Sequence, residues 1–300
     1  MTLEATGERL VPELQHGELV HAEHLVRYLL ATELAGSRRV LDAACGEGYG
    51  TGLLAAAGAR SVTGLDLDER TIAQARARYP GADFVVGDAL QLPFDDDAFD
   101  LVVSFETIEH LRDPERLLDE FARVTRDDGL LVISTPNKHR YLVENEFHHR
   151  ELAHEEFVAL LSARFSSVAV LLQHNWLTSM VLGPSLAGES SGRDTRRVDF
   201  RKVAGIEPGG ELYTVALCGS GVLPELPPLG VAASVDEAHE LARRLVEAER
   251  TAEHWHRECE RAQDEHRMAS AALVRVYDSA WWRMTRPLRW AADRARRSRG

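Results

Sequence analysis

The chain has 300 residues, 44% of them apolar, and a formal net charge of −13, so it can bury one sizeable core and still leave an appendage. The acidic balance argues against a domain that grips nucleic acid, and no apolar run reaches the roughly eighteen residues that a membrane span needs. The three cysteines (Cys45, Cys218 and Cys259) are too widely spaced for a disulfide framework or a zinc knuckle, and we expect a cytoplasmic protein.

A predicted helical lid, residues 1–36, precedes the most informative stretch of the chain. Val40–Gly50 has the pattern of a buried strand ending in a glycine turn, with an acidic residue, Asp42, shortly before the turn. The glycines from Gly46 to Gly50 follow G-x-G-x-G, which departs from the G-x-G-x-x-G of dinucleotide-binding turns. The Asp42 carboxylate would repel a pyrophosphate but attract a cofactor that carries an ammonium and a sulfonium. This stretch therefore favours S-adenosylmethionine (SAM) over NAD.

Three further predicted strands each end next to an acidic side chain. Ser61–Asp68 ends around Asp66, where a carboxylate can accept hydrogen bonds from both ribose hydroxyls. The next strand leads into Asp88, an acceptor for the adenine amino group, and Phe99–Phe105 delivers Glu106 to the pocket mouth. The residues that we assign to SAM binding are Asp42, Gly46, Gly48, Asp66, Leu67, Asp88, Ala89 and Phe105.

Strands and helices alternate through this region, as βαβ units require. The predicted helices lie at about 50–58, 69–79, 114–125 and 154–163, and the apolar runs at 130–134, 167–172 and 212–218 complete the sheet. With its ordered acidic strand ends, the pattern resembles the class I SAM-dependent methyltransferases over roughly residues 37–220. The resemblance implies a doubly wound, Rossmann-like α/β fold with a seven-stranded sheet, which we place at 37–221. The alternative is a doubly wound domain whose acidic strand ends are ordinary surface groups.

A polar insertion at about 176–210 separates the last two predicted strands. It contains several glycines and serines and a basic cluster at Arg193, Arg196 and Arg197. Loops of this length inside a compact domain are usually functional or mobile. We expect substrate recognition there, with a flexible surface excursion as the alternative.

Residue types that bind metals cluster after the fourth strand, at Glu106, Glu109 and His110. In a helical turn, positions i, i+3 and i+4 project on one side, which would face the methyl group. The E-x-x-E-H motif with a later histidine resembles the metal-dependent O-methyltransferases, including the small-RNA 2′-O-methyltransferases and the ubiquinone-pathway O-methyltransferases. Those families hold a divalent ion with two glutamates and two histidines. The resemblance implies Mn²⁺ or Mg²⁺ at Glu106, Glu109, His110 and His148, and assigns catalysis to His110, Glu106 and His148.

The resemblance selects His148 over His149 as the fourth ligand. Phe157 matches the helical aromatic position of the family, and the ligand lies nine residues before it. Two alternatives need no metal. His110 would then act as the general base, or it would be merely a histidine at a helix terminus.

A linker with three prolines, residues 222–234, separates the predicted domain from a segment of different periodicity. From 235 to 280, apolar residues recur in alternating steps of three and four from Ala238 to Ala280, the 3.5-residue repeat of a coiled coil. The seam is rich in alanine and contains one polar residue, His266. We expect a homo-oligomer formed through this coiled coil, and the alternative is a helix that packs back on the catalytic domain.

The last segment, 281–300, is aromatic and basic. Residues 271–300 hold eight arginines against two aspartates, a net charge of +6. Tryptophans and arginines together are typical of segments that lie on anionic headgroups. We expect peripheral association with the inner face of the membrane; an acidic partner or a solvated tail would explain the same composition.

Three segments indicate the acceptor class. Thr6–Pro12, Glu23–Tyr28 and Phe147–Glu151 resemble bacterial methyltransferases of surface-polysaccharide and glycan pathways, and the segment 279–289 is similar to tails of glycan-assembly proteins. The resemblance implies O-methylation of a sugar hydroxyl in a glycan, glycolipid or polysaccharide. A hydroxyl is a poor nucleophile at neutral pH, so a metal or a base must activate it. The alternatives are a small-molecule O-methyltransferase for a quinone or secondary metabolite, RNA 2′-O-methylation, and a non-catalytic coiled-coil assembly protein.

Overall fold

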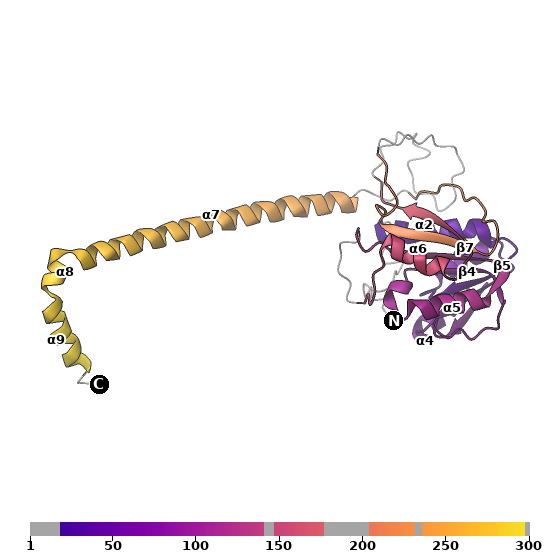
Figure 1. The fold of residues 1–300 in the computed structure, drawn as a ribbon, viewed down its shortest axis with the longest axis horizontal. Coiled ribbons are helices and arrows are strands. Elements are labelled where there is room, and N and C mark those ends of the chain that lie inside the picture. The colour runs from indigo at the N-terminus through magenta and orange to yellow at the C-terminus, as the bar shows by residue number, and fades with distance from the viewer. Residues whose placement is uncertain (1–18, 141–146, 177–203, 232–235, 298–300) are drawn as a thin grey trace. The chain divides into compact units, whose positions relative to one another are not determined.

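The computed structural model describes residues 19–140, 147–176, 204–231 and 236–297 (Figure 1). It divides the chain into two compact units, residues 1–234 and 235–300, and each is described by itself. Residues 1–18 of the predicted lid and most of the predicted insertion, 177–203, lie outside the described residues.

The first unit is built on a seven-stranded sheet with the strand order β3-β2-β1-β4-β5-β7-β6. The strands are β1 (Arg39–Ala43), β2 (Ser61–Asp66), β3 (Asp83–Val86), β4 (Phe99–Phe105), β5 (Thr125–Pro136), β6 (Ser167–Gln173) and β7 (Tyr213–Gly219). The neighbours from β3 to β5 pair in parallel, whereas β7 is antiparallel to both β5 and β6. This confirms the predicted doubly wound, seven-stranded α/β fold.

Helices cover both faces of this sheet (Figure 1). They are α2 (Leu19–Ala35), α3 (Tyr49–Ala56), α4 (Glu69–Arg78), α5 (Pro114–Val124) and α6 (His154–Ser162), and a 3₁₀ turn, η1, spans Ile108–His110. Consecutive strand residues point to opposite faces, so Val40 packs in one core cluster with Leu54 of α3, while Leu41 packs in the other with Leu117 of α5. Burial on both faces explains why the central strands are continuous apolar runs.

Two local features differ from the predicted boundaries. The strand predicted at Ser61–Asp68 ends at Asp66, because the Asp68 side chain caps α4 by accepting hydrogen bonds from the backbone N–H groups of Arg70 and Thr71. The turn predicted from Glu106 begins later and is a 3₁₀ turn, so the side chains of Glu106 and Glu109 are not set by α-helical geometry.

Helix α2 belongs to the core of the first unit. Its residues Tyr28, Ala31 and Leu34 are buried, and the helix packs against α3 and β4. It therefore brings side chains of the N-terminal segment to the central strands.

The position of the site follows from the strand order. The chain leaves β1 through α3 toward β2, and leaves β4 through α5 toward β5, so the two connections diverge from neighbouring parallel strands. Ligands of open α/β sheets bind at such a switch point, beyond the carboxyl ends of the strands. Ala44 (φ 61°) and Glu106 (φ 51°), the residues that directly follow β1 and β4, both have left-handed backbones. Non-glycine residues in this region store strain and concentrate at functional sites.

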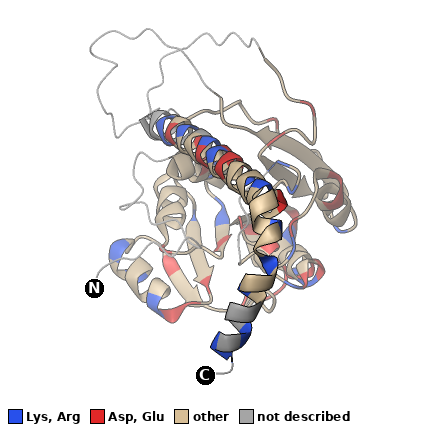
Figure 2. Cartoon of the chain, turned by 90° about the vertical axis from the view of Figure 1, so that its left-hand side faces the viewer, with Lys and Arg blue, Asp and Glu red and all other residues tan. Residues whose placement is uncertain are grey.

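The second unit is helical. Its elements are α7 (Asp236–Asp278), α8 (Ala280–Met284) and α9 (Arg286–Arg297). Arginines are interspersed with Asp and Glu along α7 (Figure 2), with local ion pairs such as Arg261 with Glu258. Among the described helices, none combines the length and apolar character that crossing a bilayer requires.

From Ala248 onward, the described residues of the predicted seam of α7 are exposed. Trp255 and Leu273 lie on the seam and expose 66% and 58% of their surface. An exposed apolar stripe on a 43-residue helix is what a coiled-coil partner would cover. A second copy of the chain, the predicted partner, offers an identical stripe.

We expect the full-length protein to be an oligomer and a version truncated after Pro228 to be a monomer in sedimentation equilibrium. The substitution Leu273→Glu, which puts a charge in the seam, should shift the oligomer toward monomer. Val274→Glu is the matched control, because Val274 is equally exposed, at 58%, but lies off the seam. Monomeric full-length protein, or equal effects of the two substitutions, would contradict the predicted coiled coil.

Candidate active site

The turn after β1 is shaped by its glycines. Gly48 has φ +79°, and a Cβ atom there would lie 2.7 Å from the Phe84 ring, so the position has no room for a side chain. Gly46 also has a left-handed backbone, φ +54°, but a Cβ there would meet nothing within 4 Å. The turn is therefore packed against the protein at Gly48 and open at Gly46, where a ligand can approach the backbone closely.

Asp66 links the end of β2 to this turn. One carboxylate oxygen accepts the Gly46 N–H at 3.0 Å, and the other accepts the Asp68 N–H, also at 3.0 Å. The side chain is 7% exposed. The same carboxylate that is predicted to bind the ribose thus also holds the glycine turn in place.

The remaining cofactor residues differ in their surroundings. Leu67 is 72% exposed beside Asp66, and Asp88 is exposed and accepts the Leu90 N–H at 2.8 Å. Ala89 packs at the margin of the core, and the Phe105 ring is buried edge-on against Tyr28, with ring centroids 5.0 Å apart. Leu67 and Asp88 present side chains to a ligand, whereas Phe105 would meet one through its backbone.

Asp42 is completely buried beneath the turn. Its oxygens accept hydrogen bonds from the Tyr28 hydroxyl at 3.1 Å and the Thr51 hydroxyl at 2.6 Å. Burial raises the pKa of Asp42 to about 6, although both hydrogen bonds oppose the rise. The predicted attraction of a cationic cofactor would act through the charge of Asp42, because both of its oxygens already have partners inside the protein.

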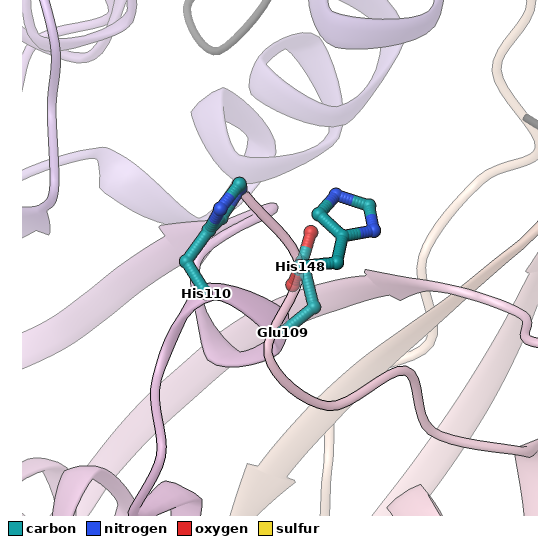
Figure 3. Close-up of side chains that lie close together, drawn as sticks. All are labelled: Glu109, His110 and His148. Carbon is teal, nitrogen blue, oxygen red and sulfur yellow. The ribbon is translucent and has the colours of Figure 1, made fainter. Parts of the chain in front are cut away.

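Beyond β4, three of the four predicted metal ligands come together. Ligand atoms of Glu109, His110 and His148 all lie within 4.8 Å of one another (Figure 3). Glu109 and His110 lie in η1, and His148 comes from the loop after β5. In the close-up, the Glu109 carboxylate lies between the two imidazole rings.

Backbone hydrogen bonds hold the two parts of this cluster together. The N–H groups of His149 and Arg150 donate to the Glu109 carbonyl at 2.9 and 3.1 Å. His149 therefore contributes its backbone, while the side chain of His148 joins the cluster, as the resemblance implied. The loop position of His148 is thus fixed by the residues that follow it.

Each imidazole also has a partner on its Nδ1 atom. His110 Nδ1 lies 3.1 Å from the Phe147 carbonyl, and His148 Nδ1 lies 3.3 Å from a Glu151 carboxylate oxygen. Such contacts fix the tautomer of metal-binding histidines and leave Nε2 as the ligand atom.

The Glu109 carboxylate is the least satisfied group of the cluster. It is completely buried; one oxygen accepts from the Thr135 hydroxyl at 3.2 Å, and the other, Oε1, has no hydrogen-bond partner. Burial raises the pKa of Glu109 well above its usual range, and the nearby Glu106 carboxylate raises it further. A cation bound here would stabilise the charged form, so the residues fit a divalent ion on the chemistry of the donor set.

Glu106, the fourth predicted ligand, is held outside this group. Its Oε1 accepts from the Ser134 hydroxyl at 2.6 Å and lies 4.0 Å from the Arg27 guanidinium. The 3₁₀ turn and the left-handed backbone of Glu106 direct its side chain toward β5 and α2. The structure therefore assembles a three-residue cluster with Glu106 beside it.

Residues on α2, β6 and β7 that the sequence did not assign also reach the site. Arg27 is 1% exposed and donates to the Gln173 side chain at 2.9 Å, and its guanidinium stacks on Tyr213, 4.6 Å from the ring centroid. The Tyr213 hydroxyl donates to Glu23 at 2.8 Å. In the sequence, only the spacing of Glu23 and Arg27 on one helix face indicated that they act together. Their partners could not be found from the sequence, because these lie almost 150 residues or more further along the chain.

Comparisons with known proteins agree with this geometry. Residues 41–133 match the model of a methyltransferase domain. The chain is 41% identical over 174 residues to a probable S-adenosylmethionine-dependent methyltransferase of Mycobacterium tuberculosis, with 56% of this chain and 63% of that relative covered. It is 38% identical over 135 residues to phthiotriol/phenolphthiotriol dimycocerosates methyltransferase 1 of Mycobacterium ulcerans, which covers 44% of this chain and 46% of the relative. The chain thus spans less than two thirds of these relatives.

Solved structures show the same fold. A protein of Pyrococcus horikoshii superposes with a TM-score of 0.51 at 17% identity, with 73% of this chain and 100% of that chain covered. A SAM-dependent methyltransferase of Thermotoga maritima gives a TM-score of 0.51 at 23% identity, over 71% of this chain and 97% of the other. The chain therefore resembles SAM-dependent methyltransferases, with residues 41–133 as the part that the methyltransferase-domain model matches, and the strand-end carboxylates and the open glycine turn agree with this resemblance.

Proposed function

We propose that this chain is an O-methyltransferase that transfers the methyl group of SAM to a sugar hydroxyl of a glycan, glycolipid or polysaccharide. The observation that carries the proposal is the cluster of Glu109, His110 and His148 beyond β4, next to the strand that carries the glycine turn. SAM carries its methyl group on a sulfonium, which departs as a neutral thioether and is therefore already a good leaving group. The protein must therefore bind the acceptor in line and activate its hydroxyl.

The cluster supports activation by a metal. A divalent ion held by Glu109, His110 and His148 would act as a Lewis acid toward an acceptor oxygen and lower the pKa of the hydroxyl. Two imidazoles favour Mn²⁺ or another first-row ion over Mg²⁺, which prefers oxygen ligands. The buried Oε1 of Glu109, which has no partner, is the atom that such an ion would satisfy.

General-base catalysis by His110 is the competing mechanism. The contact of its Nδ1 atom with the Phe147 carbonyl would leave Nε2 as the basic nitrogen that takes the acceptor proton. In that mechanism Glu109 is a structural residue. Metal dependence separates the two mechanisms.

The acceptor class rests on the sequence resemblance. One relative is named for phthiotriol/phenolphthiotriol dimycocerosates, which keeps an acceptor other than a glycan as the alternative. A panel of sugar and small-molecule acceptors separates these classes. A purely structural role is disfavoured because the glycine turn, Asp66 and Asp88 retain the arrangement that a cofactor needs.

The basic end of the chain fits an acceptor at a membrane surface. Trp281, Leu288 and Trp290 are 68%, 73% and 64% exposed on α8 and α9. The Arg289 guanidinium stacks on the Trp282 ring, 3.5 Å from its centroid, so cationic and aromatic groups share one surface. We infer that this segment binds anionic headgroups, where tryptophan rings and arginines are both favoured.

SAM binding is tested at Asp66. Asp66→Asn keeps the size of the side chain but removes the charge that faces the ribose, so SAM should bind more weakly by about 2 kcal/mol, the order of a charge-assisted hydrogen bond. Titration calorimetry measures this, with Asp83→Asn at the opposite end of the neighbouring strand as the control. Equal affinities in the two variants would sink the assignment of Asp66.

The metal is tested by chelation and by binding of Mn²⁺. Chelation should abolish turnover and Mn²⁺ should restore it. His148→Ala should weaken Mn²⁺ binding beyond the roughly 10- to 100-fold loss that follows removal of an outer-shell partner. His149→Ala is the matched control, because the imidazole of His149 follows His148 in the sequence but lies outside the cluster. Full activity of a preparation shown by elemental analysis to be free of metal would refute the metal and return the role to His110 as base.

Membrane association is tested by cosedimentation with vesicles. The full-length protein should pellet with phosphatidylglycerol vesicles more than with phosphatidylcholine vesicles, and added salt should reduce binding as it screens the arginines. Truncation after Asp278 removes α8 and α9 and should abolish binding. If the full-length protein fails to pellet even at low salt, the segment is an ordinary solvated helix.

A further inference from the structure

Glu211 is a buried carboxylate that belongs to neither the cofactor residues nor the Glu109 cluster. It lies two residues before β7 and is completely buried. Its Oε1 is 2.5 Å from His154 Nδ1 and accepts from the Thr214 hydroxyl at 2.7 Å, while Oε2 accepts the Gly209 N–H at 2.7 Å. Burial acts to raise the pKa of Glu211, but the hydrogen bonds from Thr214 and His154 outweigh it and lower the pKa. Glu211 is therefore ionised at neutral pH.

The contact with His154 links Glu211 to α6. An ionised carboxylate only accepts hydrogen bonds, so His154 Nδ1 carries the proton that lies between the two side chains. The His154 side chain is 12% exposed and that of Glu211 is fully buried. Removing one partner from a buried pair leaves the other uncompensated, which is costly. The pair is therefore a strong link between α6 and the segment that leads into β7.

This link holds one end of the loop that carries His148. His154 is the first residue of α6, and the loop runs directly before it. Nearer to His148, the N–H groups of His149 and Arg150 donate to the Glu109 carbonyl. Only residues 151–153 separate these two attachments, so a displacement of one is passed to the other along a short piece of chain.

Asn137 joins the same link to the sheet. It directly follows β5, is completely buried, and donates from Nδ2 to the carbonyls of Gly209 and Glu211 at 3.0 and 3.2 Å. Its backbone forms a bridge with Leu152, and the Lys138 N–H donates to the Leu152 carbonyl at 3.1 Å. The end of β5 therefore holds both the segment that carries Glu211 and the loop before α6.

We propose that Glu211 and His154 are positioning residues that hold this loop so that the His148 imidazole stays in the Glu109 cluster. The inference rests on the proposed function, in which His148 binds a divalent ion. Loops are usually the mobile parts of a domain, whereas a bound ion needs its ligands within about 0.5 Å of a fixed geometry. The buried pair supplies that constraint from outside the cluster, because neither of its side chains belongs to it.

The alternative is a purely structural role, in which the donors satisfy the Glu211 carboxylate and do nothing more. Thr214 separates the two roles, because its hydroxyl donates to the same Oε1 atom as His154 but belongs to β7. Thr214→Val and His154→Ala each remove one donor from that oxygen, and only His154→Ala releases the loop. Thr214→Val is therefore the matched control.

The first measurement is hydrogen–deuterium exchange of the full-length protein, followed by mass spectrometry. In His154→Ala, residues 147–153 should exchange about 10-fold faster or more, because one hydrogen bond to a charged group no longer opposes local opening. Thr214→Val should leave this exchange at the wild-type rate. Equal rates in the wild-type protein and His154→Ala, or equal increases in the two variants, would overturn the positioning role.

The second measurement is Mn²⁺ binding by the same proteins. His154→Ala should weaken it about 10-fold, the lower end of the range for an outer-shell group, while SAM binding stays unchanged. His154→Asn should restore most of the Mn²⁺ affinity, because its side-chain amide offers an N–H donor in place of Nδ1. Faster exchange with no loss of Mn²⁺ affinity would also contradict the proposal, because the loop would then not determine where His148 lies.

A second variant keeps the test decisive if His154→Ala does not fold. Glu211→Gln keeps the size of the side chain but removes its charge, and it should raise the exchange of residues 147–153 several-fold. An unchanged rate in that variant would overturn the role of Glu211. Wild-type protein that fails to bind Mn²⁺ contradicts the proposed metal site itself, whereas the exchange comparison still decides whether the pair holds the loop.

Discussion

The parallel pairing of β1 with β4 is the constraint on which the site depends. It brings the glycine turn and the η1 turn to the same edge of the sheet, although more than fifty residues separate them along the chain. Because the two connections leave in opposite directions, the edge between them stays uncovered by either helix. The left-handed residues Ala44 and Glu106 redirect the chain at this edge. The packing of the sheet compensates for the backbone strain of both residues.

Buried charge is the second common feature of the site. Asp42 and Glu109 are completely buried carboxylates, and Arg27 is a nearly completely buried guanidinium. Asp42 has two hydroxyl partners, but Glu109 and Arg27 each retain atoms with none. The protein alone therefore bears the desolvation costs of these unpartnered atoms. Ligands that bind only the folded state also stabilise it, so these costs link binding to stability.

The sequence was most informative where local pattern and fold agree. Phe99–Phe105 was predicted with its observed ends, because its predominantly apolar residues suit a strand that is buried on both faces. Leu130–Ser134 was recognised as strand, but β5 begins at Thr125, because the polar residues 126–128 resemble a turn and are exposed in the strand. Thr125 pairs with Phe99 of β4 across a shift in register, and this pairing marks the start of β5.

Side-chain direction was less predictable than strand position. Glu106, Glu109 and His110 were expected on one side of a helical turn, but a left-handed residue followed by a 3₁₀ turn separates Glu106 from the other two. Asp42 was identified from its place before the glycines, yet its burial depends on Tyr28 of α2. The contacts of Arg27 with Gln173 and Tyr213 join residues almost 150 or more apart and have no local pattern.

Glu106 connects the two incomplete parts of the site. It lies 4.0 Å from Arg27, and its charge also raises the pKa of Glu109. At that separation, two unit charges attract by roughly 4 kcal/mol at the effective dielectric near a protein surface, before their desolvation is counted. A cation at the Glu109 cluster would add a second positive charge near Glu106, and the ionised form of Glu106 would then be stabilised from both sides.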